Sequence, residues 1–208
     1  MGMRLRLSLL VGTVCVGLAA VAGLAYRAAG RVEGAVQNVA ALRDVPRAGR
    51  PDGRALWTYY APVCYADHNS GAGLQAAWRS IGGSVGAEGG RQQWLPCAAE
   101  LSYALDRAGA PIPPVRGASN RNSDGRRYIL SARLMRRYLR SRWGRPDLPG
   151  YDVQGCQPSS AAFLHALGLG DRLAVFASDS HVGVIKTGYS DPYLPYLATA
   201  DIWILPVS

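Results

Sequence analysis

The spacing of apolar residues changes along this chain, and that change limits the fold classes open to it. The first part carries apolar residues at intervals of three and four, which is typical of amphipathic helices. The last part carries short runs rich in valine and isoleucine, separated by turn sequences such as SDS, which predict antiparallel strands. The expected helices span 97–108, 131–144 and 159–168, and the expected strands span 173–177, 181–187 and 200–207. The sequence therefore predicts an α+β domain in which N-terminal helices pack on a small antiparallel C-terminal sheet.

One cysteine lies at the beginning of the first of these helices, in the stretch QQWLPCAAELSYALDRAG. Pro96 suits a first helical turn, and Gly109 ends the helix. One apolar stripe follows from the spacing of Leu101, Ala104, Leu105 and Ala108. Cys97 is therefore expected where unpaired backbone N–H groups and the helix dipole favour a thiolate. Two interpretations stay open from this stretch: a nucleophile, or a small buried side chain that starts a core helix.

Two segments, one before and one after the expected helix at 97–108, predict loops. The stretch IGGSVGAEGG at 81–90 contains five glycines in ten residues, a density that is typical of irregular structure. The stretch PIPPVRGASNRNSDGRR at 111–127 is polar and rich in turn-forming residues. We expect no regular element in the glycine-rich segment.

The N-terminal segment has the layout of an export signal. Arg4 and Arg6 precede an apolar run from Leu7 to Tyr26, which is about long enough to span a bilayer. We expect a signal peptide or signal anchor at 1–26, a linker or stalk at 27–55, and a folded domain at 56–208. The protein is then periplasmic or secreted, or it is tethered to the inner membrane through residues 7–26 if the leader is not cleaved.

Export makes disulfides possible, and three cysteines follow the leader. A bridge between Cys64 and Cys156 is the pairing that leaves Cys97 with a free thiol, although the sequence alone allows any of the three pairings. The Cys and His residues show no spacing typical of a metal site. We therefore expect neither a metal nor another cofactor.

The formal net charge of +9 indicates an attraction to anionic partners. Much of this charge lies on the expected helix SARLMRRYLRSRWG, whose arginines surround an apolar side. Few aromatic residues are interleaved with the arginines, and the protein is expected to be exported. The helix therefore favours a solvated face or contact with an anionic wall polymer over nucleic-acid binding.

A histidine that begins an expected strand completes a candidate catalytic couple. His181 follows the turn SDS, so its ring can project from the edge of the sheet. With Cys97 it would form a thiolate–imidazolium couple, in which the imidazole takes the thiol proton and later donates a proton to a leaving amine. A third group should orient the imidazole, and Asp191 or Asp201 could do so. The backbone N–H of Cys97 would serve an oxyanion site, for which the candidate side-chain donors are Gln92 and Gln93.

Four stretches carry a resemblance to a known family: IGGSVG at 81–86, PCAAELSYALDRAGAPIP, RRYILSARLMRRYL, and DRLAVFASDSHVGVIKTGYSDPYLPYLATADIWIL. Over residues 56–208 the chain resembles the type VI secretion amidase effector 4 family, whose fold is related to the NlpC/P60 and papain-like cysteine hydrolases. In that family a cysteine and a histidine act with an aspartate shortly after the histidine strand. The resemblance assigns these roles to Cys97, His181 and Asp191, with Asp201 as the fallback for the third position.

The resemblance implies a peptidoglycan amidase. Such enzymes cut the amide between D-glutamate and meso-diaminopimelate in stem peptides, without a cofactor, and a cognate immunity protein is the expected protein partner. The competing hypothesis is an exported, membrane-tethered module that binds wall peptide or a partner protein without cutting it. A free, reactive Cys97 favours the enzyme, whereas Cys97 oxidised to a disulfide favours the binding module.

Overall fold

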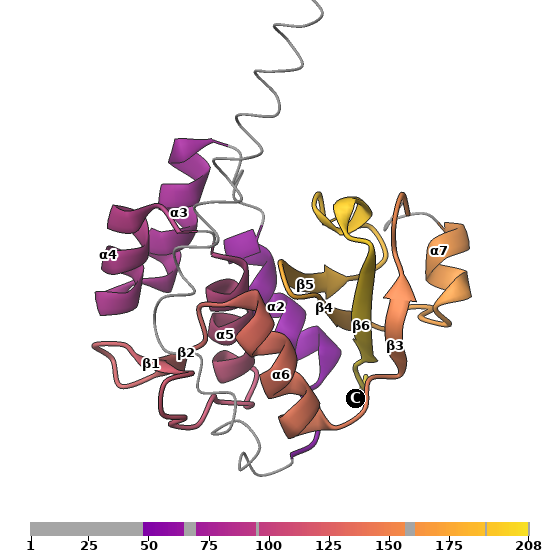
Figure 1. Cartoon of the computed structure of the whole chain (residues 1–208), viewed down its shortest axis with the longest axis horizontal. Helices are drawn as coiled ribbons and strands as arrows, with labels where there is room; N and C mark the ends of the chain where they lie inside the picture. The colour runs from indigo at the N-terminus through magenta and orange to yellow at the C-terminus, as the bar shows by residue number, and fades with distance from the viewer. Residues whose placement is uncertain (1–47, 65–69, 95, 157–160, 190, 208) are drawn as a thin grey trace, which may run out of the picture. The chain divides into compact units, whose positions relative to one another are not determined.

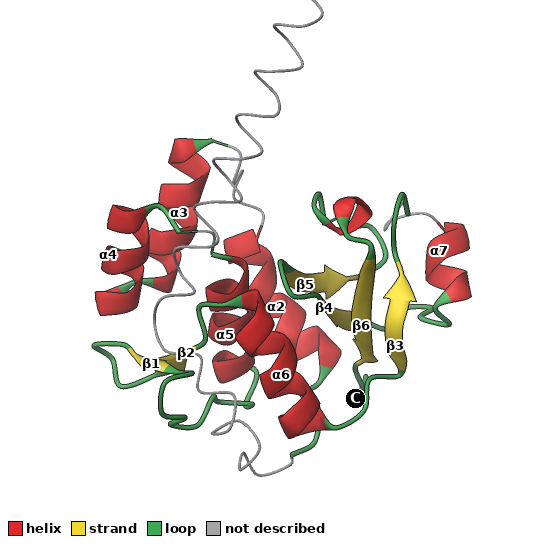
Figure 2. Cartoon of the chain, viewed as in Figure 1, coloured by secondary structure: helices red, strands yellow, loops and turns green. Residues whose placement is uncertain are grey.

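The structure is a computed structural model that describes residues 48–64, 70–94, 96–156, 161–189 and 191–207. It confirms the α+β prediction, because helices α2 to α6 precede all four strands of a small antiparallel sheet (Figures 1 and 2). The predicted leader at 1–26 and most of the predicted linker lie outside the described residues. Within the described ranges, no helix combines the length and the apolar character needed to cross a bilayer.

The main sheet has four strands in the order β3-β6-β4-β5, and each neighbouring pair is antiparallel. A separate two-stranded hairpin joins β1 and β2 within the predicted polar segment. The helices are α2 (Gly53–Cys64), α3 (Gly71–Ile81), α4 (Gly83–Gln92), α5 (Cys97–Arg107), α6 (Ala132–Trp143), α7 (Ala161–Ala166) and the short 3₁₀ helix η3 (Leu194–Tyr196). The strands are β1 (Asn120–Arg121), β2 (Arg127–Tyr128), β3 (Leu148–Asp152), β4 (Ala174–Ala177), β5 (Val182–Ile185) and β6 (Thr199–Ile204).

Apolar side chains on both faces of the sheet are buried, and each face contributes to a separate apolar cluster. On one face, Val175, Val184 and Trp203 pack with residues of α2, α5 and α6. On the other face, Phe176 and Ile202 pack with residues of α7 and of the η3 segment. Because successive side chains of a strand point to opposite faces, the sheet separates the two clusters.

The helices predicted from apolar spacing are present. Helix α5 begins at Cys97, as predicted, and packs against β5. Helix α6 begins after Ser131, whose hydroxyl accepts a hydrogen bond from the Leu134 backbone N–H. Helix α7 lies within the third predicted range. Helices α5 and α6 follow from local sequence, because each buries one continuous apolar stripe.

The prediction of an irregular loop at 81–90 is wrong, because this segment forms most of helix α4. The glycines of α4 allow a very close approach to the neighbouring helix. A Cβ at Gly86 would lie 2.4 Å from the Trp78 carbonyl oxygen, and a Cβ at Gly89 would lie 2.5 Å from the Trp78 ring. Helix α4 therefore packs against α3 at a distance that larger residues would prevent, and this packing outweighs the low helix propensity of glycine.

The folded part also begins earlier than predicted. The Ala48 N–H donates to the Arg142 carbonyl at 2.9 Å, and the Gly53 N–H donates to the Pro206 carbonyl at 2.8 Å. Residues 48–55, which the sequence assigned to the linker, are thus attached to α6 and to the C-terminal end of the chain. Strand β3, which the sequence did not predict, pairs with β6 at the edge of the sheet and contains proline and glycine.

The predicted bridge between Cys64 and Cys156 is not formed, since the structure has Cys64, Cys97 and Cys156 as free thiols. Cys64 packs against the cluster that contains α5, whereas Cys156 packs against the cluster on the opposite face of the sheet. The two cysteines therefore belong to different apolar clusters, which the sheet separates.

Candidate active site

Cys97 is the first residue of α5, and Pro96 precedes it as the N-cap. The Cys97 residue is 8% exposed, so little of it reaches solvent. Pro96 supplies no side-chain cap, and its carbonyl accepts the Glu100 N–H at 2.8 Å. The side chain of the N-cap residue therefore does not occupy the N-terminus of α5, where an anion is favoured.

His181 lies directly before β5, and its ring is held by one carboxylate. The His181 Nε2 atom is 3.1 Å from Asp191 Oδ1 and 3.2 Å from Asp191 Oδ2. Asp191 is 3% exposed, and its Oδ1 also accepts the backbone N–H groups of Tyr193 at 2.9 Å and Leu194 at 3.2 Å. These two N–H groups fix the carboxylate, and the carboxylate fixes the ring.

The thiol of Cys97 acts on the same ring, through a hydrogen bond and its charge. Burial of His181 opposes its protonation, but the charge of Asp191, the hydrogen bond to Asp191 and the hydrogen bond to Cys97 outweigh burial and raise the pKa of His181 to about 10. Because Nε2 faces Asp191, Nδ1 is the ring nitrogen left for the thiol. The structure thus brings together Cys97, His181 and Asp191.

Two aromatic rings and one glycine that were not predicted from the sequence shape the surroundings of His181. The Phe176 and Tyr193 ring centroids lie 5.6 Å and 5.0 Å from that of His181. Gly183 leaves space for the Asp191 carboxylate, since a Cβ there would lie 2.5 Å from Asp191 Oδ2. The sequence signal for Gly183 was its spacing from His181, because residues two apart on a strand share a face. A glycine at that position indicates space beside the histidine ring.

Asp201, the fallback for the third position, is bound elsewhere. Its side chain is fully buried; Arg136 Nε donates to Oδ2 at 2.8 Å and Arg140 Nη2 donates to Oδ1 at 2.8 Å. Burial opposes ionisation of Asp201, but the hydrogen bonds from Arg140, Arg136 and the Gly150 N–H outweigh it and lower the pKa of Asp201 to about 2. Asp201 therefore joins β6 to α6 and does not orient His181.

This arrangement also changes the interpretation of the arginine-rich helix. Arg136 and Arg140 bind the buried Asp201, and Arg136 Nη1 also donates to Asp179 Oδ1 at 2.9 Å. The helix was predicted to present a solvated face or a contact surface for wall polymer. Part of its positive charge is instead used to attach α6 to the sheet and to the turn before His181.

The two glutamines proposed for the oxyanion site lie at the end of α4. The Gln92 amide donates to Glu88 Oε1 at 3.1 Å, and both glutamines are exposed. Gln93 has a φ of 52°, and its backbone N–H donates to the Gly89 carbonyl as the C-cap of α4. Their contribution to an oxyanion site stays a prediction.

The other two described thiols are held in the neutral form. Burial raises the pKa of Cys64 to about 12, against a smaller opposite effect of its hydrogen bond with Tyr189. Burial also raises the pKa of Cys156. Since the thiolate is the reactive form, both of these thiols are poor nucleophiles at neutral pH.

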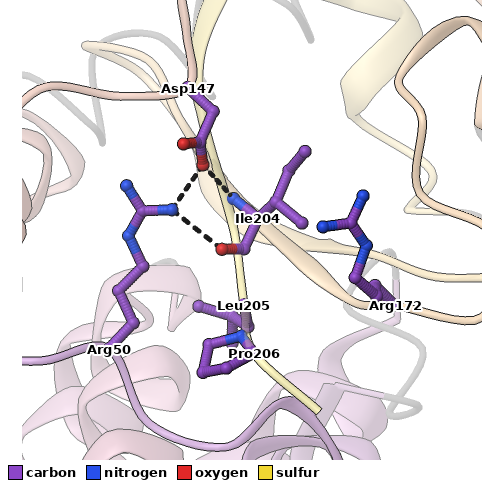
Figure 3. A pocket seen from close by; sticks show the side chains of 6 residues that line it. All are labelled: Arg50, Asp147, Arg172, Ile204, Leu205 and Pro206. Carbon is purple, nitrogen blue, oxygen red and sulfur yellow. Dashed lines mark hydrogen bonds and ion pairs between the residues drawn. The ribbon is translucent and has the colours of Figure 1, made fainter.

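A pocket of about 500 Å³ lies away from this site (Figure 3). It is lined by Arg50, Asp147, Arg172, Ile204, Leu205 and Pro206. Ile204 pairs with Ala174 at the beginning of β4, whereas His181 follows the other end of that strand. Among the described residues, no group of three or more His, Cys, Asp or Glu side chains could hold a metal ion.

Comparison with known proteins finds similarity in structure only. No protein-family model and no curated protein sequence matches the chain. The type VI effector Tae4 from Enterobacter cloacae has a TM-score of 0.57 and 20% identity over 77% of this chain and 100% of that chain. Tae4 from Salmonella typhimurium, in complex with the immunity protein Tai4 from Enterobacter cloacae, has a TM-score of 0.55 and 21% identity over 76% of this chain and 100% of that chain. The Tae4–Tai4 type VI effector–immunity complex from Salmonella Typhimurium has a TM-score of 0.56 and 22% identity, again over 76% of this chain and 100% of that chain. This chain therefore shares the fold of these effectors.

Proposed function

We propose that this chain is a cysteine amidase of the type VI secretion amidase effector 4 family, with a fold related to NlpC/P60 and papain-like hydrolases. Its proposed reaction is hydrolysis of the amide between D-glutamate and meso-diaminopimelate in peptidoglycan stem peptides. The observation that carries the proposal is one imidazole held between the Asp191 carboxylate and the Cys97 thiol at a helix N-terminus. The shared fold with type VI effectors and the sequence resemblance support the same family.

In the first half of the reaction, the Cys97 thiolate attacks the carbonyl carbon of the scissile amide. The carbonyl π electrons move onto oxygen, and the Cys97 backbone N–H stabilises that oxyanion, with Gln92 or Gln93 as the proposed additional donor. The tetrahedral intermediate then collapses with cleavage of the C–N bond. The His181 imidazolium gives its proton to the leaving amine, which leaves a thioester on Cys97 and a neutral imidazole.

In the second half, the neutral His181 takes a proton from water, and the resulting hydroxide attacks the thioester carbon. The C–S bond breaks, the acid product leaves, and the thiolate and imidazolium are restored. Asp191 keeps Nε2 turned away from the thiol throughout, so that Nδ1 exchanges the proton in both halves.

The proposed location and partners follow from the same assignment. We propose a periplasmic or secreted enzyme, tethered to the inner membrane if residues 7–26 are retained. The complexes of Tae4 with Tai4 support a cognate immunity protein as the partner of this chain. Nucleic acid is not a proposed partner.

The test uses purified muropeptides separated by chromatography after incubation with the protein. We expect Cys97→Ala and His181→Ala to lose turnover while they keep the far-ultraviolet circular dichroism spectrum of the wild type. Cys156→Ala is the matched control, because it removes a thiol on the opposite face of the sheet and should keep wild-type turnover. Full activity of Cys97→Ala would contradict the assignment.

The low exposure of Cys97, 8%, favours one alternative: a wall- or protein-binding module that does not cut its ligand. Alkylation of the folded chain by iodoacetamide at neutral pH distinguishes the two. Rapid modification at Cys97, located by peptide mass spectrometry, supports the amidase. A Cys97 thiol that stays unmodified for as long as the other thiols, together with binding of intact muropeptides, supports the binding module.

A further inference from the structure

The turn between β4 and β5 is closed by one hydroxyl. Ser178 follows β4 and is 6% exposed. Its Oγ accepts the His181 backbone N–H at 2.9 Å and the Ser180 backbone N–H at 3.2 Å, and it donates to the His181 carbonyl at 3.0 Å. The Ser178 backbone N–H donates to the same carbonyl at 2.8 Å. Both backbone polar groups of His181 are thus bound to a single residue.

We propose that Ser178 is a positioning residue for the candidate active site: its hydroxyl fixes the backbone of His181, so that the ring faces Asp191 and Cys97 at the same time. The expected effect of Ser178 on turnover rests on the proposed function. The expected effect on the placement of the imidazole against the thiol does not depend on it.

The geometry of the ring explains why the backbone must be fixed. The imidazole has to meet a carboxylate at Nε2 and a thiol at its other nitrogen, and the positions of the two partners are set by different elements, the η3 segment and α5. A change in the backbone dihedrals of His181 moves both ring nitrogens, so it disturbs the contact with Asp191 and the contact with Cys97 at the same time. A misplacement of about 1 Å in such a site can lower the rate about 100-fold.

The neighbouring residues of the turn do not supply the same constraint. Ser180 is exposed, and among the described residues its Oγ reaches the Ser178 hydroxyl, at 3.3 Å. Asp179 binds Arg136 at 2.9 Å, but its side chain is 57% exposed, and exposed ion pairs contribute little. Asp179 attaches the tip of the turn to α6, whereas Ser178 holds the residue that carries the imidazole.

The test compares three variants of the full chain: Ser178→Ala, Ser178→Thr, which keeps the hydroxyl, and Ser180→Ala, the matched control. The first measurement is the rate of Cys97 alkylation by iodoacetamide at pH 7, followed by peptide mass spectrometry. We expect Ser178→Ala to lower this rate about 10-fold, because a displaced imidazolium stabilises the thiolate less. Ser180→Ala should alkylate at the wild-type rate.

The second measurement is hydrolysis of muropeptides, where Ser178→Ala should lower kcat about 10- to 100-fold and leave KM unchanged, since Ser178 is not expected to touch substrate. Equal alkylation rates in Ser178→Ala and wild type overturn the inference. If the wild type does not cut muropeptides, the proposed function fails, and the alkylation rates still decide the positioning role. If Ser178→Ala does not fold, Ser178→Thr decides: a wild-type alkylation rate supports the role of the hydroxyl, and a slowed rate overturns it.

Discussion

Residue 183 decides where the carboxylate beside the imidazole can lie. Gly183 follows His181 by two positions, so both face the same side of β5. A Cβ at Gly183 would lie 2.5 Å from Asp191 Oδ2 and 2.8 Å from Cε1 of Phe176, closer than real Cβ atoms come to other atoms. Asp191 and Phe176 are both buried and have little room to move. The missing side chain therefore allows the carboxylate to lie over the strand and reach His181 Nε2.

We expect Gly183→Ala to displace Asp191 from His181. Overpacking a buried site costs about 1–3 kcal/mol in the free energy of unfolding, and turnover of muropeptides should fall at least about 10-fold because the imidazole loses its anchor. Gly49→Ala is the control, since a Cβ there meets no atom within 4 Å. Wild-type turnover in Gly183→Ala would show that the carboxylate is not needed over β5.

The His181–Asp191 contact also predicts how stability depends on pH. The pKa of His181 is raised to about 10 in the folded chain, above its ordinary value of 6.5. The stabilisation from this contact is therefore fully present below about pH 6.5 and is lost as the pH rises through about 10. Urea unfolding at pH 6, 8 and 10 should give a steeper loss of free energy of unfolding in the wild type than in Asp191→Asn. Cys64 and Cys156 titrate in both proteins, so their effect cancels in the difference, and parallel pH curves would refute the contact.

At the scale of elements, the helices that sequence could predict are those that bury a continuous apolar stripe. The stripes of α5 and α6 are visible in local sequence, and so is the Ser131 cap. Helix α4 was not predictable in this way, because its glycines are used for close contact with Trp78, a residue on another helix. Strand β3 was missed for a related reason: it forms by pairing with β6, some 50 residues later in the chain, and its own sequence LPGYD has low strand propensity.

Two glycines in neighbouring helices should therefore respond differently to substitution by alanine. We expect Gly89→Ala to destabilise the fold by about 1–3 kcal/mol, because the new Cβ would lie 2.5 Å from the Trp78 ring. Gly71→Ala, in the first turn of α3, meets no atom within 4 Å and should be neutral or stabilise by up to about 1 kcal/mol. Thermal and urea unfolding of the two variants measure this difference. A neutral Gly89→Ala would mean that α3 and α4 separate at little cost.

At the scale of the whole molecule, sequence could identify the reacting groups but not choose between their partners. Cys97 and His181 were identified because each lies at the beginning of a regular element. The choice between Asp191 and Asp201 depended on which face of the sheet each carboxylate occupies, and on two arginines of α6 that bind Asp201. Such contacts join segments distant in sequence, so no local pattern reports them. The attachment of residues 48–55 to the far end of the chain was hidden for the same reason.

The sheet that separates the two apolar clusters also determines the thiol chemistry of the molecule. Cys64 and Cys156 pack on opposite faces of it, and the structure has both as free thiols, so the fold gains no stability from a bridge between them. We therefore expect the unfolding temperature to be the same with and without dithiothreitol. Peptide mapping without reduction should find the two cysteines in separate, unlinked peptides. The double variant Cys64→Ala with Cys156→Ala is the control, since the unfolding temperature of a chain that lacks both thiols should also not change with dithiothreitol. A fall in unfolding temperature on reduction that the double variant does not share would establish a bridge, and it would require the two faces of the sheet to be arranged differently.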